Sequence, residues 1–274
     1  MVAPYSIVVP VHNEAGVLPQ TLPSLLDAAD GDAELVFICN GCRDASAEIL
    51  RTALAGRGRV ARVEEVAAAS KTAALNLGDG LCSVFPRFYL DADVRVPAGC
   101  FEVLAAALGD ADLVAPRIRF DMARATGCSQ AIARVWLALP HAQEAAFHHL
   151  VGLSRTGRSR WQSFPDILGD DIFMEAKTPA NRRRIVHETS IETAIPRTFF
   201  GWVRVRSRWR RGERELARMG LAVPRQGGQK ARLLAMLASP RSVWGAAAFV
   251  LVRLLAEPLS RRAQQGWFTD RSFR

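Results

Sequence analysis

The stretch Tyr5-Ser6-Ile7-Val8-Val9-Pro10-Val11-His12-Asn13-Glu14 decides the fold that we expect for this chain. Its first half, Tyr5–Val9, is a continuous apolar run with the length and β-branched content of a buried strand. A polar loop follows, and apolar residues with helical spacing begin at Leu18. We therefore expect a unit in which a buried strand, a polar loop and a helix follow one another.

The same alternation of short apolar runs and helical patterns continues through the first 119 residues. Further strands are predicted at Glu34–Cys39, Val60–Val66, Phe88–Leu90 and Asp112–Arg119, with a helix between successive strands. The helix at Leu18 is interrupted by Pro19 and Pro23, which weakens its pattern. This order favours right-handed crossovers and predicts an α/β fold with a mainly parallel sheet. Residues Cys128–Leu153 have little polar punctuation and are predicted to be helical.

Polar clusters follow the predicted strands where each of them ends. They are His12-Asn13-Glu14, Asn40-Gly41-Cys42-Arg43-Asp44, Ser70-Lys71 and Asp91-Ala92-Asp93. Ligands of open α/β sheets bind outside the carboxyl ends of the strands. The sequence therefore predicts that these clusters converge on one edge of the sheet and form a ligand site there.

Two carboxylates, Asp91 and Asp93, are separated by one residue directly after the apolar Phe88–Leu90 run. Hard oxygen ligands suit Mg²⁺ or Mn²⁺, which in turn bind phosphate oxygens. A pair of solvated turn acids is the alternative, because this spacing is common. The position at a strand end favours the metal site.

Two other features have both a chemical and a structural interpretation. Lys71 is the only lysine before residue 177 and begins a helix, where backbone N–H groups attract phosphate. Taken in isolation, an ordinary exposed lysine in the first turn is the favoured interpretation. Asp170 and Asp171 are adjacent carboxylates, and mutual repulsion in a cleft raises a pKa toward that of a general base. An N-capping pair before Ile172 is the alternative.

Several common motifs are incomplete or absent. Cys39 and Cys42 form one C-x-x-C, but the other cysteines do not supply the second pair that structural zinc requires. A redox pair and two ordinary strand-end residues remain open, the second being favoured. His148 and His149 lack the i, i+4 spacing of a metalloprotease helix. The sequence contains no Walker A motif, no G-x-G-x-x-G and no nucleophile elbow.

The charge of the chain is unevenly distributed. Its 274 residues carry 36 Lys and Arg against 27 Asp and Glu, a net charge of +9. Residues 1–137 carry 12 basic and 16 acidic side chains, whereas residues 138–274 carry 24 and 11. With 49% hydrophobic residues the chain is not of the disordered class. The five cysteines and the uncharged N-terminal residues predict a cytoplasmic protein without a signal peptide.

In combination, these motifs resemble family 2 glycosyltransferases. Ile7–Glu14 is similar to the opening strand of that family with its Pro-x-x-Asn-Glu, and the motifs at 40–44, 71–76, 91–93 and 169–171 follow in the family's order. The resemblance implies a GT-A fold over residues 1–200, with a nucleotide-binding half over about 1–120 and an acceptor half over about 121–200. Residues 201–274 would form a basic helical tail.

The resemblance also implies roles for individual residues. The nucleotide-sugar pocket would contain Pro10, His12, Glu14, Asn40, Asp44, Lys71, Asn76 and Asp91. Asp93 and Asp91 would hold a Mn²⁺ or Mg²⁺ ion that bridges the diphosphate. Asp171 would act as the catalytic base, with Asp170 where the family often has Glu. The expected reaction moves one sugar from a nucleotide-sugar donor to an acceptor hydroxyl and inverts the anomeric centre.

Two departures from the family pattern matter. Many members have Asp where this chain has Cys39, and that carboxylate usually contacts the nucleotide base. The donor is therefore not predicted to be specifically a UDP-sugar. The Gln-x-x-Arg-Trp motif of processive synthases is incomplete, because Val205 precedes Arg208-Trp209 where Gln is expected. We therefore predict addition of a single sugar, with Arg208 as a further candidate for holding the donor diphosphate.

The basic tail has several interpretations. Arginines interleaved with Trp202 and Trp209 suit nucleic acid or a membrane interface. The apolar run Val243–Val252 is too short for a confident membrane span, so an interfacial helix is predicted, with a buried helix as the alternative. We predict peripheral contact with the inner face of the membrane, no nucleic acid, and an acceptor that is lipid-linked or membrane-proximal.

Two other functions compete with sugar transfer. A nucleotidyltransferase also combines a Rossmann-like sheet with acidic metal ligands, but it should carry a Gly-rich basic loop after the first strand, where this chain has His12-Asn13-Glu14. A catalytically inert basic adaptor for membrane or nucleic acid would depend on the tail alone. The adaptor predicts that Asp93 is dispensable, and the transferase predicts that it is essential.

Overall fold

The computed structural model describes residues 4–29, 31–55, 61–139, 147–221 and 228–261. The chain divides into two compact units. The first comprises residues 1–119 and 147–193 and is called the sheet unit; the second comprises 120–146 and 194–274 and is called the helical unit. The segment 201–274, predicted as a tail, thus shares its unit with residues 120–146.

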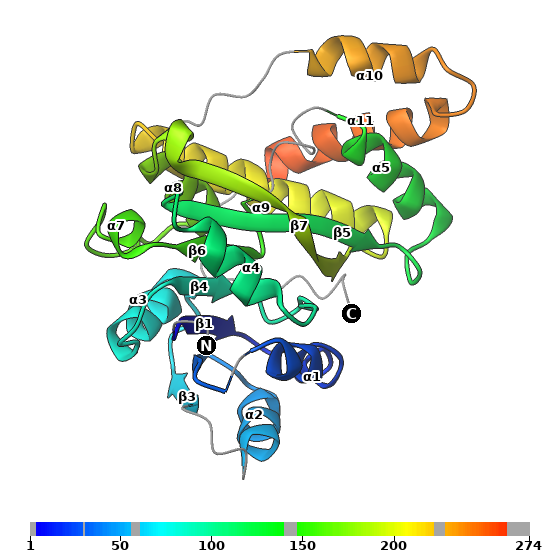
Figure 1. Cartoon of the computed structure of the whole chain (residues 1–274). Helices are drawn as coiled ribbons and strands as arrows, with labels where there is room; N and C mark the ends of the chain where they lie inside the picture. Colours follow the sequence, from blue (N-terminus) through cyan, green and yellow to red (C-terminus); the bar gives the residue numbers. More distant parts are fainter. Residues whose placement is uncertain (1–3, 30, 56–60, 140–146, 222–227, 262–274) are drawn as a thin grey trace. The chain divides into compact units, whose positions relative to one another are not determined.

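A single seven-stranded sheet forms the first unit (Figure 1). Its strands are β1 (Ser6–Val11), β2 (Glu34–Asn40), β3 (Ala61–Val66), β4 (Arg87–Leu90), β5 (Leu113–Asp121), β6 (Leu150–Leu153) and β7 (Arg183–Ala194), in the order β3-β2-β1-β4-β6-β5-β7. The first four pair in parallel, and β6 runs antiparallel to both β4 and β5. The predicted α/β fold with a mainly parallel sheet is confirmed. All five predicted strands form, with ends shifted by one or two residues.

One prediction in this unit is wrong. Leu150–Leu153 was predicted as the end of a helix but forms strand β6. Among the described residues of the predicted helix, those up to Leu137 are helical, as α5 (Gly127–Leu137), and residues 140–146 lie outside the described part of the chain. All four residues of β6 are buried, and the strand lies between β4 and β5. A short apolar run without period looks the same in a buried strand and a buried helix, so only the neighbouring strands decide between them.

Helices cover both faces of the parallel strands. Helices α1 (Leu18–Ala28), α2 (Ser46–Leu54) and α4 (Cys100–Ala107) share one buried cluster with alternate residues of β1 and β2. Helix α3 (Lys71–Leu81) packs on the other face, where Val36 and Ile38 of β2 contact Ala74. Helix α1 forms despite its prolines, because Pro19 falls in the first turn and Leu18, Leu22 and Leu25 are buried.

A close contact fixes α3 on the sheet. A Cβ at Gly78 would lie 2.4 Å from Cγ1 of the buried Val8, so the helix backbone rests directly on β1. Ser70 caps the helix: its hydroxyl accepts a hydrogen bond of 3.2 Å from the Ala73 amide. Capping and packing together place the first residue of the helix, Lys71, beside the carboxyl end of β1, where it lines a pocket with Pro10.

The helical unit has its own core. It contains α5, α9 (Phe199–Arg218), α10 (Gln229–Leu237) and α11 (Val243–Leu259). Trp202 is 2% exposed and donates a hydrogen bond of 2.8 Å from Nε1 to the Ser129 hydroxyl, and Trp209 packs against the same core. The interpretation of Trp202 as membrane-facing is therefore wrong. Within the described residues, no helix combines the length and hydropathy needed to cross a membrane.

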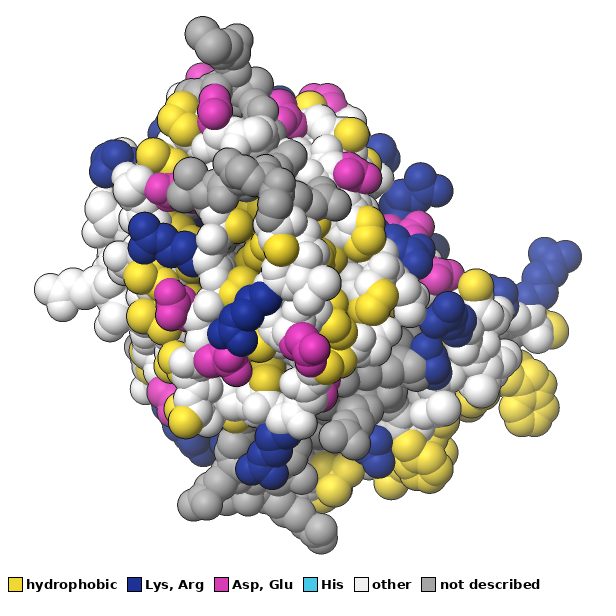
Figure 2. Space-filling model, turned by 90° about the horizontal axis from the view of Figure 1, so that it is seen from below, with side chains coloured by type: hydrophobic (Ala, Val, Ile, Leu, Met, Phe, Trp, Pro, Cys, Tyr) yellow, Lys and Arg dark blue, Asp and Glu magenta, His cyan; other side chains and the backbone are white. Residues whose placement is uncertain are grey.

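Surface charge is mixed on the side of the molecule drawn in Figure 2. Hydrophobic, basic and acidic side chains are interspersed there, and the basic ones that are described do not merge into one stripe. Nucleic-acid-binding faces have such a stripe or patch. The basic side chains described on this face therefore do not form a patch of the kind that binds nucleic acid.

Candidate active site

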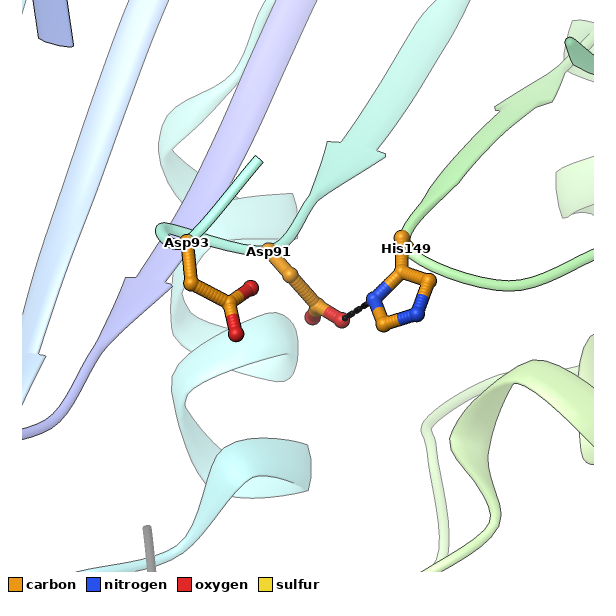
Figure 3. Close-up of side chains that lie close together, drawn as sticks. All are labelled: Asp91, Asp93 and His149. Atoms are coloured by element: carbon orange, nitrogen blue, oxygen red, sulfur yellow. Dashed lines mark hydrogen bonds and ion pairs between the residues drawn. The ribbon is translucent and has the colours of Figure 1, made fainter. Parts of the chain in front are cut away.

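Two acids and a histidine meet where β4 and β6 lie side by side (Figure 3). Asp91 and Asp93 follow β4, and His149 directly precedes β6. The His149 ring nitrogen Nδ1 lies 3.1 Å from Oδ2 of Asp91, and the Asp91 amide donates a 2.8 Å hydrogen bond to the His149 carbonyl. One ligand atom from each of the three residues lies within 4.8 Å of the others. The donor set of two carboxylates and one imidazole fits a divalent cation.

His149 adopts an unusual backbone conformation. Its φ is +67°, in the left-handed region that residues other than glycine rarely occupy. A strained residue of this kind costs about 1–3 kcal/mol and persists only where its surroundings hold it. The contacts with Asp91 hold it here. In this conformation the imidazole points toward the carboxylate of Asp91, with Asp93 beyond it, as Figure 3 shows.

Lys71 lies between two of the predicted acidic motifs. Its Nζ is 2.7 Å from Oδ1 of Asp91 and 3.0 Å from Oδ2 of Asp170, and the side chain is only 19% exposed. Burial opposes the charge of Lys71, but the nearby carboxylates of Asp170, Asp91 and Asp171 raise its pKa well above the usual range. The lysine is therefore a permanent cation held among carboxylates. The alternative interpretation of Lys71 as an ordinary exposed lysine is therefore wrong.

The adjacent acids Asp170 and Asp171 begin helix α8 (Asp170–Lys177) but differ in their environment. Burial raises the pKa of Asp170 to about 6, against the opposing effect of Lys71. Burial would also raise the pKa of Asp171, but the charge and hydrogen bond of His148 lower it to about 2. Nδ1 of His148 contacts Oδ2 of Asp171 directly. The sequence predicted a raised pKa for this pair, and the structure assigns it to Asp170.

The pairing of His148 with Asp171 predicts a pH-dependent contribution to stability. The pKa of Asp171 is lowered from 3.8, so its contribution is present above that value and is lost as the pH falls toward 2. Burial lowers the pKa of His148, but the charge and hydrogen bond of Asp171 raise it, and the net pKa lies above 6.5. The contribution of His148 to stability is therefore complete below pH 6.5 and is lost as the pH rises through the raised pKa. The ion pair is therefore complete between about pH 4 and 6.5.

We expect His148→Gln to reduce the free energy of unfolding by about 1 kcal/mol near pH 5 and by less near pH 9.5. Denaturant titrations of both proteins with a chelator present measure this difference. An equal loss at both pH values would contradict the ion pair.

A second group of predicted residues surrounds the ends of β1 and β2. The His12 ring nitrogen Nδ1 contacts the backbone carbonyl of Asn40, and the side-chain amide of Asn40 donates to the Val11 backbone carbonyl at 2.9 Å. Asn13 has φ +55°, and its side-chain oxygen accepts from the Arg43 amide at 2.8 Å. These contacts fasten the loop after β1 to the loop after β2.

The same loops are joined through Asp44. Its carboxylate accepts hydrogen bonds from the amides of Ala15 and Ser46, each at 3.1 Å, and the Ser46 hydroxyl accepts one of 2.8 Å from the Glu14 amide. Glu14 is 6% exposed. Asp44 and Glu14 therefore help to shape this edge of the sheet, and their contact with a nucleotide stays a prediction.

The two other predicted donor contacts are Asn76 on α3 and Arg208 on α9. The side-chain nitrogen of Asn76 donates to the Phe164 carbonyl at 2.9 Å, and its side-chain oxygen accepts from the Phe164 amide at 2.7 Å. These bonds fasten the segment after α7 (Arg155–Arg158) to α3. Arg208 is half-buried on α9 in the helical unit. Their roles in donor binding stay predictions.

The central residues line one pocket. Pro10, Lys71, Asp91, Asp170 and Asp171, all predicted from the sequence, share its wall with His149. Parallel strands and α3 bring the first three together, and α8 supplies the acids. The predicted convergence at the carboxyl edge of the sheet is thus observed for Lys71 and Asp91.

A comparison with protein families decides the affiliation of the chain. Residues 6–163 match the model of glycosyl transferase family 2, which is more than half of the sequence. The chain belongs to glycosyl transferase family 2. It is therefore a glycosyltransferase. Curated protein sequences give no significant match.

Solved structures agree with the fold of this glycosyltransferase. The mannosyltransferase PcManGT from Pyrobaculum calidifontis, in complex with GDP-Man and Mn²⁺, superposes with a TM-score of 0.60 at 16% identity, over 95% of this chain and 76% of that one. Glucosyl-3-phosphoglycerate synthase from Mycobacterium tuberculosis, with Mn²⁺, UDP and glucosyl-3-phosphoglycerate, gives 0.52 at 19% identity, over 81% of each chain. S. aureus TarS with UDP-GlcNAc gives 0.53 at 12% identity, over 91% and 72%.

Sequence analysis of this transferase missed His148 and His149. The pair was compared only with the helical i, i+4 spacing of metalloproteases, whereas it lies directly before strand β6. The adjacent side chains contact different acids, His148 reaching Asp171 and His149 reaching Asp91. The useful signal was two histidines next to a short apolar run. It becomes informative only when that run is known to be a strand beside β4.

Proposed function

We propose that this transferase moves one sugar from a nucleotide-sugar donor to an acceptor hydroxyl, with inversion and with a bound Mn²⁺ or Mg²⁺ ion. The observation that carries the proposal is the pocket that Lys71, Asp91, His149, Asp170 and Asp171 line together. Cation ligands, a fixed positive charge and two carboxylates in different environments are the parts that such a reaction needs. Crystal structures of PcManGT and the mycobacterial synthase contain Mn²⁺ together with a nucleotide, which supports the cation.

Asp93, Asp91 and His149 are the proposed cation ligands. A divalent cation bound there would neutralise the diphosphate and stabilise its departure as a Lewis acid. Lys71 would provide a second positive charge near the diphosphate, because its ammonium already lies against Asp91. Pro10, His12, Glu14, Asn40 and Asp44 are the proposed contacts to the nucleoside, from the loops after β1 and β2, with Asn76 and Arg208 as further candidates.

Asp171 is the proposed base. The acceptor oxygen would attack the anomeric carbon while the bond from that carbon to the diphosphate oxygen breaks, and Asp171 would take the hydroxyl proton. His148 holds one carboxylate oxygen of Asp171, which orients the other for the acceptor. Asp170, beside it, has the higher pKa and contacts Lys71, so its proposed task is to position the lysine.

The finer features of the predicted function are also proposals. We propose that a donor-binding half covers about residues 1–120, that an acceptor-binding half covers about 121–200, and that 201–274 is a basic helical segment. We also propose that the enzyme acts at the cytoplasmic face of a membrane on a lipid-linked or membrane-proximal acceptor. The basic charge of residues 138–274 supports this. Family membership favours sugar transfer over the nucleotidyltransferase and the inert adaptor.

A panel of nucleotide-sugars tests the proposal. Each donor is added to the protein with and without Mn²⁺, and the melting temperature is recorded. Binding at 100 times Kd stabilises the folded state by about 2.7 kcal/mol, so the correct donor should raise the melting temperature by several degrees only when Mn²⁺ is present. A donor that shifts it equally without the cation contradicts metal-assisted binding. No shift with any donor contradicts the proposed function.

A further inference from the structure

Helix α11 is apolar on two opposite faces. One face packs on α5 and α9, and its residues Ala246, Phe249, Val252 and Ala256 are at most 5% exposed. The other face carries large apolar side chains that solvent reaches: Trp244 is 84% exposed, Leu251 47%, Leu254 64%, Leu255 39% and Leu259 41%. A helix that is hydrophobic all round is normally buried on all sides. This outer face therefore lacks the apolar environment that its composition requires.

The exposed residues form a helical stripe. From Trp244 to Leu251 is two turns, and Leu251, Leu255 and Leu259 follow at intervals of four. Single exposed leucines are ordinary on protein surfaces, whereas a contiguous stripe marks an interaction site. We call these four residues, together with Leu254, the outer face of α11.

The unit that carries this face is strongly basic. Residues 120–146 and 194–274 contain 19 Lys and Arg against 6 Asp and Glu, a net charge of +13. Three of the acids, Glu213, Glu215 and Glu257, already form ion pairs with arginines of the same unit. The excess of positive charge therefore remains for an external partner. Exposed basic residues lie on both sides of the outer face, with Arg241 before α11 and Arg261 after it.

We propose that the outer face of α11 docks on the surface of a bilayer that contains anionic phospholipids. An apolar stripe with an aromatic end and neighbouring arginines is typical of helices that lie in the membrane interface. Trp244 would sit at headgroup level, the leucines would enter the acyl boundary, and Arg241 and Arg261 would meet lipid phosphates. At 17 residues the helix is about 25 Å long, which suits lying on the surface and not spanning it.

Charge and hydrophobicity together favour an anionic bilayer over two other partners, a second copy of the chain and nucleic acid. A second copy of the chain would bring another basic unit against the first, and repulsion opposes that contact. Nucleic acid would satisfy the arginines but would leave the leucines in water. An anionic bilayer satisfies both the charge and the apolar stripe. The inference requires neither donor nor cation, so it stands or fails independently of the proposed sugar transfer.

Vesicle co-sedimentation of the full-length protein tests the inference. Wild type should sediment with vesicles of phosphatidylcholine and phosphatidylglycerol and at least 10-fold less with pure phosphatidylcholine, and salt should weaken the binding. Trp244→Ser combined with Leu254→Ser should lower the partition coefficient at least 10-fold. The matched control is Phe200→Ser, since Phe200 is 69% exposed at the start of α9 in the same unit. It should bind like wild type.

Thermal melting confirms that each variant is folded, and gel filtration with light scattering gives the oligomeric state. Absence of sedimentation with the anionic vesicles overturns the inference. Equal vesicle binding by the double variant and by Phe200→Ser also overturns the inference. A wild-type dimer that the double variant converts to a monomer, without vesicle binding, shows that the face joins two copies instead.

Discussion

Replacing Asp93 by Asn is expected to lower kcat/KM for sugar transfer by about 10³-fold. Asp93 and Asp91 follow β4 and lie with His149 so that their ligand atoms are within 4.8 Å of one another. An amide keeps the shape of the side chain but removes the negative charge that a divalent cation requires. Loss of the cation removes several kcal/mol of stabilisation from the departing diphosphate, and each 1.36 kcal/mol is tenfold in rate.

The measurement is transfer of the donor sugar at saturating Mn²⁺, with nucleotide binding measured in parallel by calorimetry. Asp93→Asn should also abolish the part of nucleotide affinity that depends on Mn²⁺. The matched control is Asp27→Asn, because Asp27 is an exposed acid on α1 of the same unit. The control should retain wild-type activity. Full Mn²⁺-dependent transfer by Asp93→Asn would show that Asp93 is not a ligand.

Replacing Asp171 by Asn is expected to separate donor binding from chemistry. Asp171 contacts His148, which belongs to the loop before β6, whereas Asp170 forms an ion pair with Lys71. The variant should bind donor and Mn²⁺ within about 3-fold of wild type. Its kcat should fall by roughly 10²–10⁴-fold, which is the usual contribution of a general base.

The variant Asp170→Asn distinguishes the two adjacent acids. Asp170 holds Lys71, so its loss should raise the KM for the donor more than it lowers kcat. If Asp170 were the base, kcat of the wild type would fall as the pH drops through about 6, since a base must be deprotonated. With Asp171 as the base, its pKa of about 2 keeps kcat level through that range. Loss of donor binding in Asp171→Asn would contradict the assigned base.

The strands and the order of the motifs were predictable because they depend on local sequence. Apolar runs such as Glu34–Cys39 are long enough to form buried strands and too short for helices, and crossovers between parallel strands have one hand. Once those strands are parallel, Pro10, Lys71 and Asp91 must meet at the same edge. Leu150–Leu153 was not predictable, because nothing in its four residues distinguishes a central strand from a buried helix.

By itself, the sequence determined the α/β fold and the identity of the acids and the lysine in the pocket. Period and motif order carry that information, and both are properties of neighbouring residues. Only the tertiary structure decided how these groups differ chemically. Burial raises the pKa of Asp170, whereas His148 lowers the pKa of Asp171. The chain just before β6 brings two histidines to the acids. The structure also turned Trp202 into the core and left Trp244 exposed. A pKa and an exposed fraction depend on what packs around a residue, and residues distant in the sequence supply that environment.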